Sequence, residues 1–173
     1  MQGDPADKSS KDLSQPNEAP LWSALNDANK SRALVYVEFF RAIEVRYGRA
    51  VAIDICKEAI RCWGGGLAAG LKAHLPADFQ GLKASFAFAP DDGAMFRPRI
   101  DRCDSSGLEV QFMSCPLKSA WLEAGMLESD VALFCEMAAE ADYGTLEAAG
   151  FAVDIETWQP GSDGCCRLKI RPA

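Results

Sequence analysis

Apolar residues recur at intervals of three or four through the first half of the chain, from Pro20 onward. This spacing places them on one face of a helix, so it predicts amphipathic helices rather than strands. Gly48 and the three glycines at 64–66 are the expected interruptions, because glycine disfavours the interior of a helix. The predicted helical segments, the first of which is one helix or two, are 20–48, 49–63, 67–76 and 78–88.

The second half of the chain mixes two patterns. Stretches in which apolar and polar residues alternate predict strands, and turn residues at 104–107 and 160–164 separate them in pairs. Between the two pairs, Pro116 marks a helix start and a longer helical pattern follows. The predicted segments are strands at 95–103 and 108–114, helices at 116–125 and 127–147, and strands at 151–158 and 165–170. Helices followed by this β-β-α-α-β-β unit predict an α+β fold with an antiparallel sheet of about four strands.

Composition refines the organisation of the chain. Residues 1–19 contain almost no apolar side chains and are predicted to be a flexible tail. Residues 20–173 are predicted to form a single α+β domain, since a chain of 173 residues with 49% apolar side chains can fill one core. The apolar N-terminal helices are also a candidate interface for a homodimer.

Charge narrows the partners. The chain has 25 acidic and 18 basic residues, a net charge of -7, whereas a nucleic-acid surface needs a basic stripe. No apolar run reaches the roughly 18 residues of a membrane span, and residues 1–20 lack the apolar core of a secretory signal. We therefore expect a cytoplasmic protein that acts on a small-molecule substrate, with no nucleic acid, no membrane and no cofactor.

Seven cysteines and a single histidine, His74, set the available chemistry. An odd number of cysteines without an export signal indicates reduced thiols rather than a disulfide framework. Nucleophilic or metal chemistry would then depend on thiols and carboxylates. Three of the cysteines fit structural positions, because Cys56 and Cys62 lie on apolar helical stripes and Cys103 ends a hairpin strand.

Four other residues are candidates for chemistry. Cys115 lies where a strand gives way to a helix, and the free N–H groups there would lower the pKa of its thiol. Cys135 and Asp142 are seven residues apart on one predicted helix, so they share a face about 10 Å apart along the axis. Cys166 alternates with apolar residues and is predicted to point inward, which sends Cys165 outward to solvent or to the rim of the sheet.

These residues carry a resemblance. The segments concerned are Cys115-Pro116-Leu117, Phe134-Cys135, Asp142-Tyr143, Thr157 with Gly161, and Cys166-Arg167-Leu168. Across about residues 102–172 they resemble the L-2-amino-thiazoline-4-carboxylic acid hydrolase family. The resemblance implies a small bacterial hydrolase-like domain that opens 2-aminothiazoline-4-carboxylate to N-carbamoyl-cysteine. It also implies that Cys115, Cys135, Asp142 and Cys166 surround one pocket. The chain departs from the family pattern at Leu168, where relatives often have an aromatic residue or histidine, and in its Cys165-Cys166 doublet.

Ring opening at an amidine carbon needs a nucleophile, a proton donor and a group that holds the cation. Cys115 is a candidate nucleophile, with Cys135 and Cys166 as alternatives. Asp142 would hold the amidinium or act as the base for water. The predicted substrate-binding residues are Tyr143, Arg167 and Trp158, with Arg167 contacting a carboxylate.

Two other functions fit the same residues. Three inward thiols and a carboxylate suit a soft metal, although the chain has no close Cys-x2-Cys pair of the structural zinc type. The ending Cys166-Arg167-Leu168-Lys169-Ile170 also resembles the vinyl-reductase-like class of small-molecule-binding domains, which would make the protein a non-catalytic binder.

Overall fold

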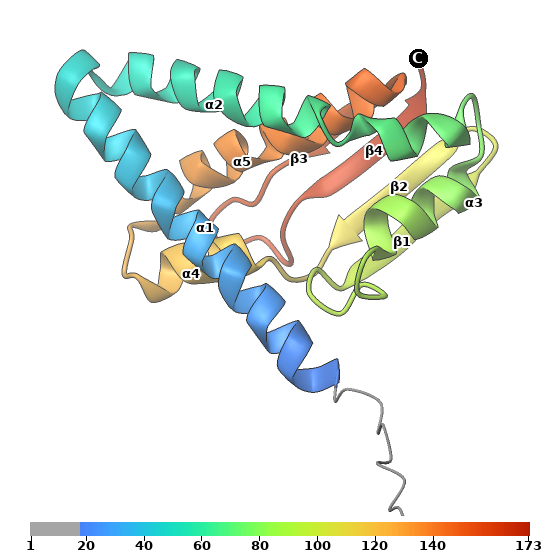
Figure 1. The fold of residues 1–173 in the computed structure, drawn as a ribbon, viewed down its shortest axis with the longest axis horizontal. Coiled ribbons are helices and arrows are strands. Elements are labelled where there is room, and N and C mark those ends of the chain that lie inside the picture. The colour runs from blue at the N-terminus through green and yellow to red at the C-terminus, as the bar shows by residue number, and fades with distance from the viewer. Residues whose placement is uncertain (1–17) are drawn as a thin grey trace, which may run out of the picture.

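The computed structural model describes residues 18–173, and a helical layer makes up the first half of this region (Figure 1). The predicted tail therefore lies outside the described residues, apart from its last two positions, which begin the first helix. The elements are α1 (Glu18–Tyr47), α2 (Arg49–Gly65), η1 (Ala68–His74), α3 (Phe79–Leu82) and η2 (Lys83–Phe88). Residues 20–47 thus form a single helix. Gly48 joins it to α2 at φ 84°, a conformation that favours glycine.

The second half forms the predicted β-β-α-α-β-β unit. Its elements are β1 (Pro98–Asp104), β2 (Gly107–Phe112), α4 (Pro116–Glu123), α5 (Glu128–Ala149), β3 (Phe151–Glu156) and β4 (Arg167–Pro172). All neighbouring strands are antiparallel, in the order β1-β2-β4-β3. The α+β fold with one four-stranded antiparallel sheet is therefore confirmed.

The start of β4 differs from the prediction in a way that shapes the site. The Cys165 N–H donates to the carbonyl of Phe112 at 2.7 Å, and the Phe112 N–H donates to the carbonyl of Cys166 at 2.9 Å. Both bonds go to one residue at the end of β2, so the regular alternation begins only at Arg167. Cys165 consequently does not take the outward position that strand alternation predicted.

Helices α2 and α5 approach each other closely along the centre of the molecule. A side chain at Gly64 would meet the backbone of Ala141, and one at Gly144 would meet the backbone of Arg61. The hydroxyl of Thr145 donates to the carbonyl of Gly64 at 2.8 Å across this contact. The glycine-rich stretch at 64–66 therefore permits close helix packing, which fixes α5 against α2.

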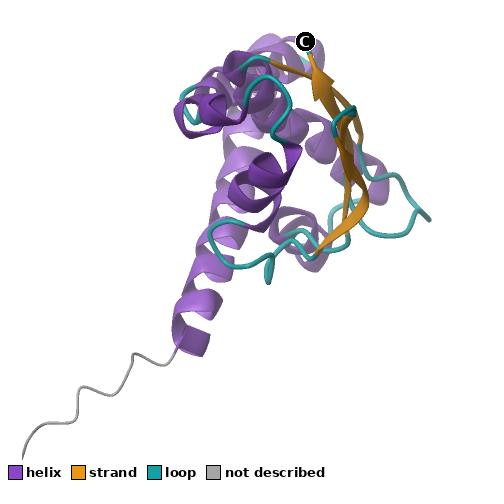
Figure 2. Ribbon diagram, turned by 90° about the vertical axis from the view of Figure 1, so that its right-hand side faces the viewer, coloured by secondary structure: helices purple, strands orange, loops and turns teal. Residues whose placement is uncertain are grey.

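The helices cover one face of the sheet, and Figure 2 shows the strands edge-on beside them. One buried cluster joins α1, α4 and α5 around Trp121, whose indole N–H donates to the carbonyl of Ala33 at 2.9 Å. A second cluster packs α3, η1 and α5 on strand residues such as Leu108 and Ile170, which are fully buried. None of the described helices is long and apolar enough to cross a membrane.

Candidate functional site

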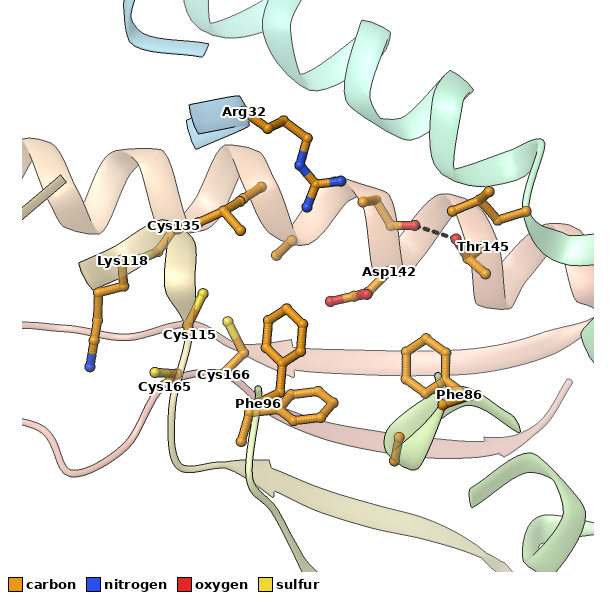
Figure 3. Close-up of a pocket in the computed structure, with 18 of the residues that line it drawn as sticks. Arg32, Phe86, Phe96, Cys115, Lys118, Cys135, Asp142, Thr145, Cys165 and Cys166 are labelled. Atoms are coloured by element: carbon orange, nitrogen blue, oxygen red, sulfur yellow. Dashed lines mark hydrogen bonds between the residues drawn. The ribbon is translucent and has the colours of Figure 1, made fainter. Parts of the chain in front are cut away.

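A cavity of about 340 Å³ lies beside α5, between the helical layer and the end of the sheet. The four residues predicted to surround one pocket, Cys115, Cys135, Asp142 and Cys166, all line it (Figure 3). They come from the start of α4, from α5 and from the chain just before β4. The structure therefore brings this set together, while the catalytic role of each member stays a prediction.

Cys165 also lines the cavity, so its predicted position at the rim is wrong. Its residue is only 6% exposed, and its thiol forms a hydrogen bond with the thiol of Cys115. The two backbone bonds to Phe112 explain the error, because they turn Cys165 inward before the strand begins. The reactive end of the cavity thus holds two adjacent thiols from distant parts of the chain.

The two thiols of this pair have different acidities. The hydrogen bond from the Cys115 thiol and the positive charge of Lys118 lower the pKa of Cys165 to about 7, against burial. The same hydrogen bond, together with burial, raises the pKa of Cys115 well above that of an ordinary thiol. The backbone N–H of Lys118 does lower it, as the helix start predicted, but the other two effects are larger. The directions of the two pKa shifts therefore favour Cys165, and not Cys115 as the helix start suggested, as the more acidic thiol.

Cys135 and Cys166 are neutral thiols. Burial, together with the nearby Cys165, raises the pKa of Cys135 to about 12. Burial also raises the pKa of Cys166, helped by the charge of Asp142, although the backbone N–H of Trp158 bonds to its sulfur. Because the thiolate is the nucleophilic form, these two residues are poor nucleophiles at neutral pH.

Asp142 and Arg32 face each other across the middle of the cavity. The carboxyl of Asp142 points into the cavity from α5, and burial raises its pKa to about 7, while the charge of Arg32 lowers it (Figure 3). Arg32 reaches in from α1, where its guanidinium lies 5.2 Å from the Trp63 ring centroid and donates to Asn29 at 2.9 Å. Its buried Nε has no hydrogen-bond partner among the described residues. A donor and a titrating carboxyl are thus both available to a ligand.

Lys118 is the second cation of the site. Its ammonium donates to the carbonyl of Gly164 at 2.8 Å and lies 5.4 Å from the Trp158 ring centroid. These contacts fix it beside the Cys115 and Cys165 pair. Cys115 and Lys118 are three residues apart at the start of one helix, a spacing that places them on the same face.

The three predicted substrate-binding residues are not among those that line the cavity. Tyr143 follows Asp142 on α5 but points away, where its hydroxyl accepts from the Ile155 N–H at 3.2 Å. Arg167 lies on the open face of the sheet and pairs with Asp101 at 3.2 Å and Glu109 at 3.3 Å. The side chain of Trp158 packs in the helical core. Arg32 and Lys118 are the cations that the cavity offers instead.

A serine, a histidine and an aspartate lie in a row near the cavity mouth. The Ser85 Oγ is 2.8 Å from His74 Nε2, and His74 Nδ1 is 2.9 Å from the carboxylate of Asp78. However, the Ser85 hydroxyl donates to the carbonyl of Gly81 at 2.8 Å, which can only accept, and Asp78 caps α3 by accepting from the Gly81 N–H. The row is a helix cap that connects η1 to α3, rather than an activated serine.

Metal binding is one of the alternatives that the sequence left open. Within residues 18–173, no three His, Cys, Asp or Glu side chains come together as the ligands of one metal ion would.

Fold and site together define a small α+β protein with a helical layer over an antiparallel sheet and a cavity that combines paired thiols with a buried carboxyl. The family model described as L-2-amino-thiazoline-4-carboxylic acid hydrolase matches residues 28–169. The chain belongs to this family, and hydrolase is the class of enzyme that membership supports. A search of curated proteins finds no match.

Proposed function

We propose that the protein is a cysteine-dependent hydrolase that opens a small cyclic amidine of the thiazoline type, with L-2-aminothiazoline-4-carboxylate as the reference substrate. The observation that supports this most is the pair of thiols, Cys115 and Cys165, beside Lys118. They share a cavity with Asp142 and Arg32. The set supplies a nucleophile and a proton carrier for the ring opening, and a cation that can pair with the substrate carboxylate.

The first step is attack by the Cys165 thiolate on the amidine carbon of the ring. The new carbon–sulfur bond forms as the bond from that carbon to the ring sulfur breaks, and the ring sulfur leaves with the bonding pair. The protonated carboxyl of Asp142, whose pKa of about 7 keeps both forms available near neutral pH, gives the leaving sulfur its proton. The product of this step is an isothiourea joined to Cys165.

The second step is hydrolysis of that adduct. Water attacks the same carbon while the Asp142 carboxylate accepts its proton, and the bond to the Cys165 sulfur breaks. The thiolate is restored, Asp142 is again protonated, and the product has gained the oxygen of a carbamoyl group. Cys115 donates its hydrogen bond to the departing thiolate, and Lys118 balances the charge.

Arg32 is the proposed partner of the substrate carboxylate. Its side chain lines the cavity, and its positive charge acts on Asp142, so the guanidinium can pair with a carboxylate bound there. The ring stack on Trp63 and the bond to Asn29 hold the guanidinium in position. Arg32 thereby takes the role that the sequence suggested for Arg167.

Mass spectrometry after incubation with L-2-aminothiazoline-4-carboxylate tests the proposal. We expect N-carbamoyl-cysteine as the product, and loss of at least about a thousandfold in activity for Cys165→Ala. Cys62→Ala is the matched control, because Cys62 is exposed on α2 and does not line the cavity. Equal turnover by Cys165→Ala and Cys62→Ala would remove Cys165 as the nucleophile. Binding without turnover by the unmodified protein would favour the non-catalytic small-molecule binder instead.

A further inference from the structure

The cavity is larger than the reference substrate. L-2-Aminothiazoline-4-carboxylate is a single small ring with two short substituents, whereas cavities of a few hundred Å³ usually hold larger ligands. The cavity here measures about 340 Å³. Space would remain around the small ring, so the lining of that space bears on the identity of the substrate.

The four thiols of the cavity are gathered at one end and lie deep. Cys135 and Cys165 are 5% and 6% exposed, and Cys115 and Cys166 lie beside them. Arg32 and Asp142 face each other farther along the cavity (Figure 3). A substrate whose amidine reaches Cys165 therefore places its carboxylate near Arg32 and any further substituent beyond Asp142.

The part of the lining beyond Asp142 is mostly apolar and leads to the opening. We call this part the apolar end, and its residues are Leu67, Leu71, Phe86, Ala87 and Ala89. Phe86 lies on the other side of Asp142 from the thiols, whereas Phe96 lies on the thiol side (Figure 3). The hydroxyls of Ser85 and Thr145 also line the cavity, but each already donates to a backbone carbonyl. Leu67 and Ala89 are exposed and mark where the cavity meets solvent.

We propose that the substrate of this site carries an aryl or branched alkyl group that occupies the apolar end. This inference rests on the proposed function for the reactive part of the substrate. A polar extension would lose its water there and find only the hydroxyls of Ser85 and Thr145, whose protons are already donated to backbone carbonyls, whereas an apolar group gains free energy by leaving water. The substrate class is thus a cyclic amidine with a carboxylate on one side and an apolar substituent that points to the opening.

Two aromatic thiazoles serve as probes because their rings resist hydrolysis. They are 2-aminothiazole-4-carboxylate and its 5-phenyl derivative, and calorimetry gives the affinity of each for the full protein. We expect the phenyl compound to bind on the order of tenfold to a hundredfold more tightly, from the apolar area that it buries. Equal affinity, or weaker binding of the phenyl compound, would overturn the inference.

A pair of tryptophan variants locates the effect. Ala89→Trp fills the apolar end at its opening, so it should abolish the preference for the phenyl compound while the affinity for the parent changes little. Ala94→Trp is the matched control, because Ala94 is equally exposed in the same loop but does not line the cavity. A preference that survives Ala89→Trp would show that the phenyl group binds elsewhere.

Turnover of L-2-aminothiazoline-4-carboxylate, measured in parallel, separates the two proposals. Hydrolysis of the thiazoline without a phenyl preference among the inert probes contradicts only the inference about the apolar end. A phenyl preference without hydrolysis upholds the apolar end and contradicts the proposed reaction.

Discussion

The two hydrogen-bonded thiols at one end of the cavity, Cys115 and Cys165, have pKa values shifted in opposite directions. The hydrogen bond from Cys115 is the largest effect that lowers the pKa of Cys165, and the charge of Lys118 adds to it. The predicted helix start pointed to Cys115, and strand alternation sent Cys165 to the rim, because neither pattern could include a chain that turns around the end of β2. The position of Lys118 beside Cys115 could have been predicted from the sequence, because it lies three residues after Cys115 on a predicted helix.

The rate at which Cys165 is alkylated should increase with pH through about pH 7. Iodoacetamide reacts with the thiolate, so the rate should follow the pKa of about 7, with Cys115, Cys135 and Cys166 reacting only at higher pH. Cys115→Ala should move the midpoint upward, since it removes the largest stabilising contact of the thiolate, and Lys118→Gln should move it less. Peptide mapping in a Cys62→Ala background measures each site. A midpoint unchanged in Cys115→Ala would contradict the pairing.

The buried carboxyl of Asp142 should make the protein less stable as pH rises. Its pKa is about 7 in the folded protein and close to 3.8 in the unfolded chain, so the folded state binds the extra proton between these values. The free energy of unfolding should therefore fall relative to Asp142→Asn by at most about 1.4 kcal/mol per pH unit over this range, and level off above pH 7. Urea unfolding at several pH values measures the difference.

Asp154→Asn is the control for this effect, because Asp154 is exposed and pairs with Arg171 on the surface. The free energy of unfolding of Asp154→Asn should differ little from that of the unmodified protein over the same pH range. A difference between the unmodified protein and Asp142→Asn that is constant from pH 4 to pH 8 would mean that the carboxyl is not destabilised by burial.

Helices and strands were predicted more fully than the site. The helical intervals and the alternating stretches identified the α+β order, because periodicity along one element follows from that element alone. The site depends on contacts between elements far apart in sequence. Arg32 is one of several polar residues on α1, and nothing in α1 alone shows that it faces Asp142 on α5. Tyr143 was predicted to lie at the site because it follows Asp142 in the sequence. One step along a helix, however, turns a side chain by about 100°.

The contact between α2 and α5 should tolerate no side chain at Gly144. A β-carbon there would meet the backbone of Arg61 and Gly65, which cannot move without separating the helices. Gly144→Ala should therefore lower the free energy of unfolding by about 1–3 kcal/mol, as overpacking usually does. Gly70→Ala is the matched control, because nothing lies within 4 Å of its added carbon. Equal unfolding midpoints for the two variants would contradict this close contact.

The cavity unites parts of the molecule that the chain keeps far apart. Arg32 comes from α1, Cys115 and Lys118 from α4, Asp142 from α5, and Cys165 from the chain before β4. A ligand that contacts all of them must bind the folded protein and not the unfolded chain. Binding should then stabilise the whole molecule by mass action.

Thermal unfolding with 2-aminothiazole-4-carboxylate tests this coupling. At about one hundred times its dissociation constant the ligand should add about 2.7 kcal/mol to the free energy of unfolding, which raises Tm by several degrees in a domain of this size. Arg32→Gln should lose most of the rise, since it removes the proposed carboxylate partner. Arg46→Gln is its control, because Arg46 lies on the same helix, is exposed, and does not line the cavity. An equal rise in both variants would show that α1 takes no part in binding the ligand, and the carboxylate would then need a different cation, for which Lys118 is the one that the cavity lining offers.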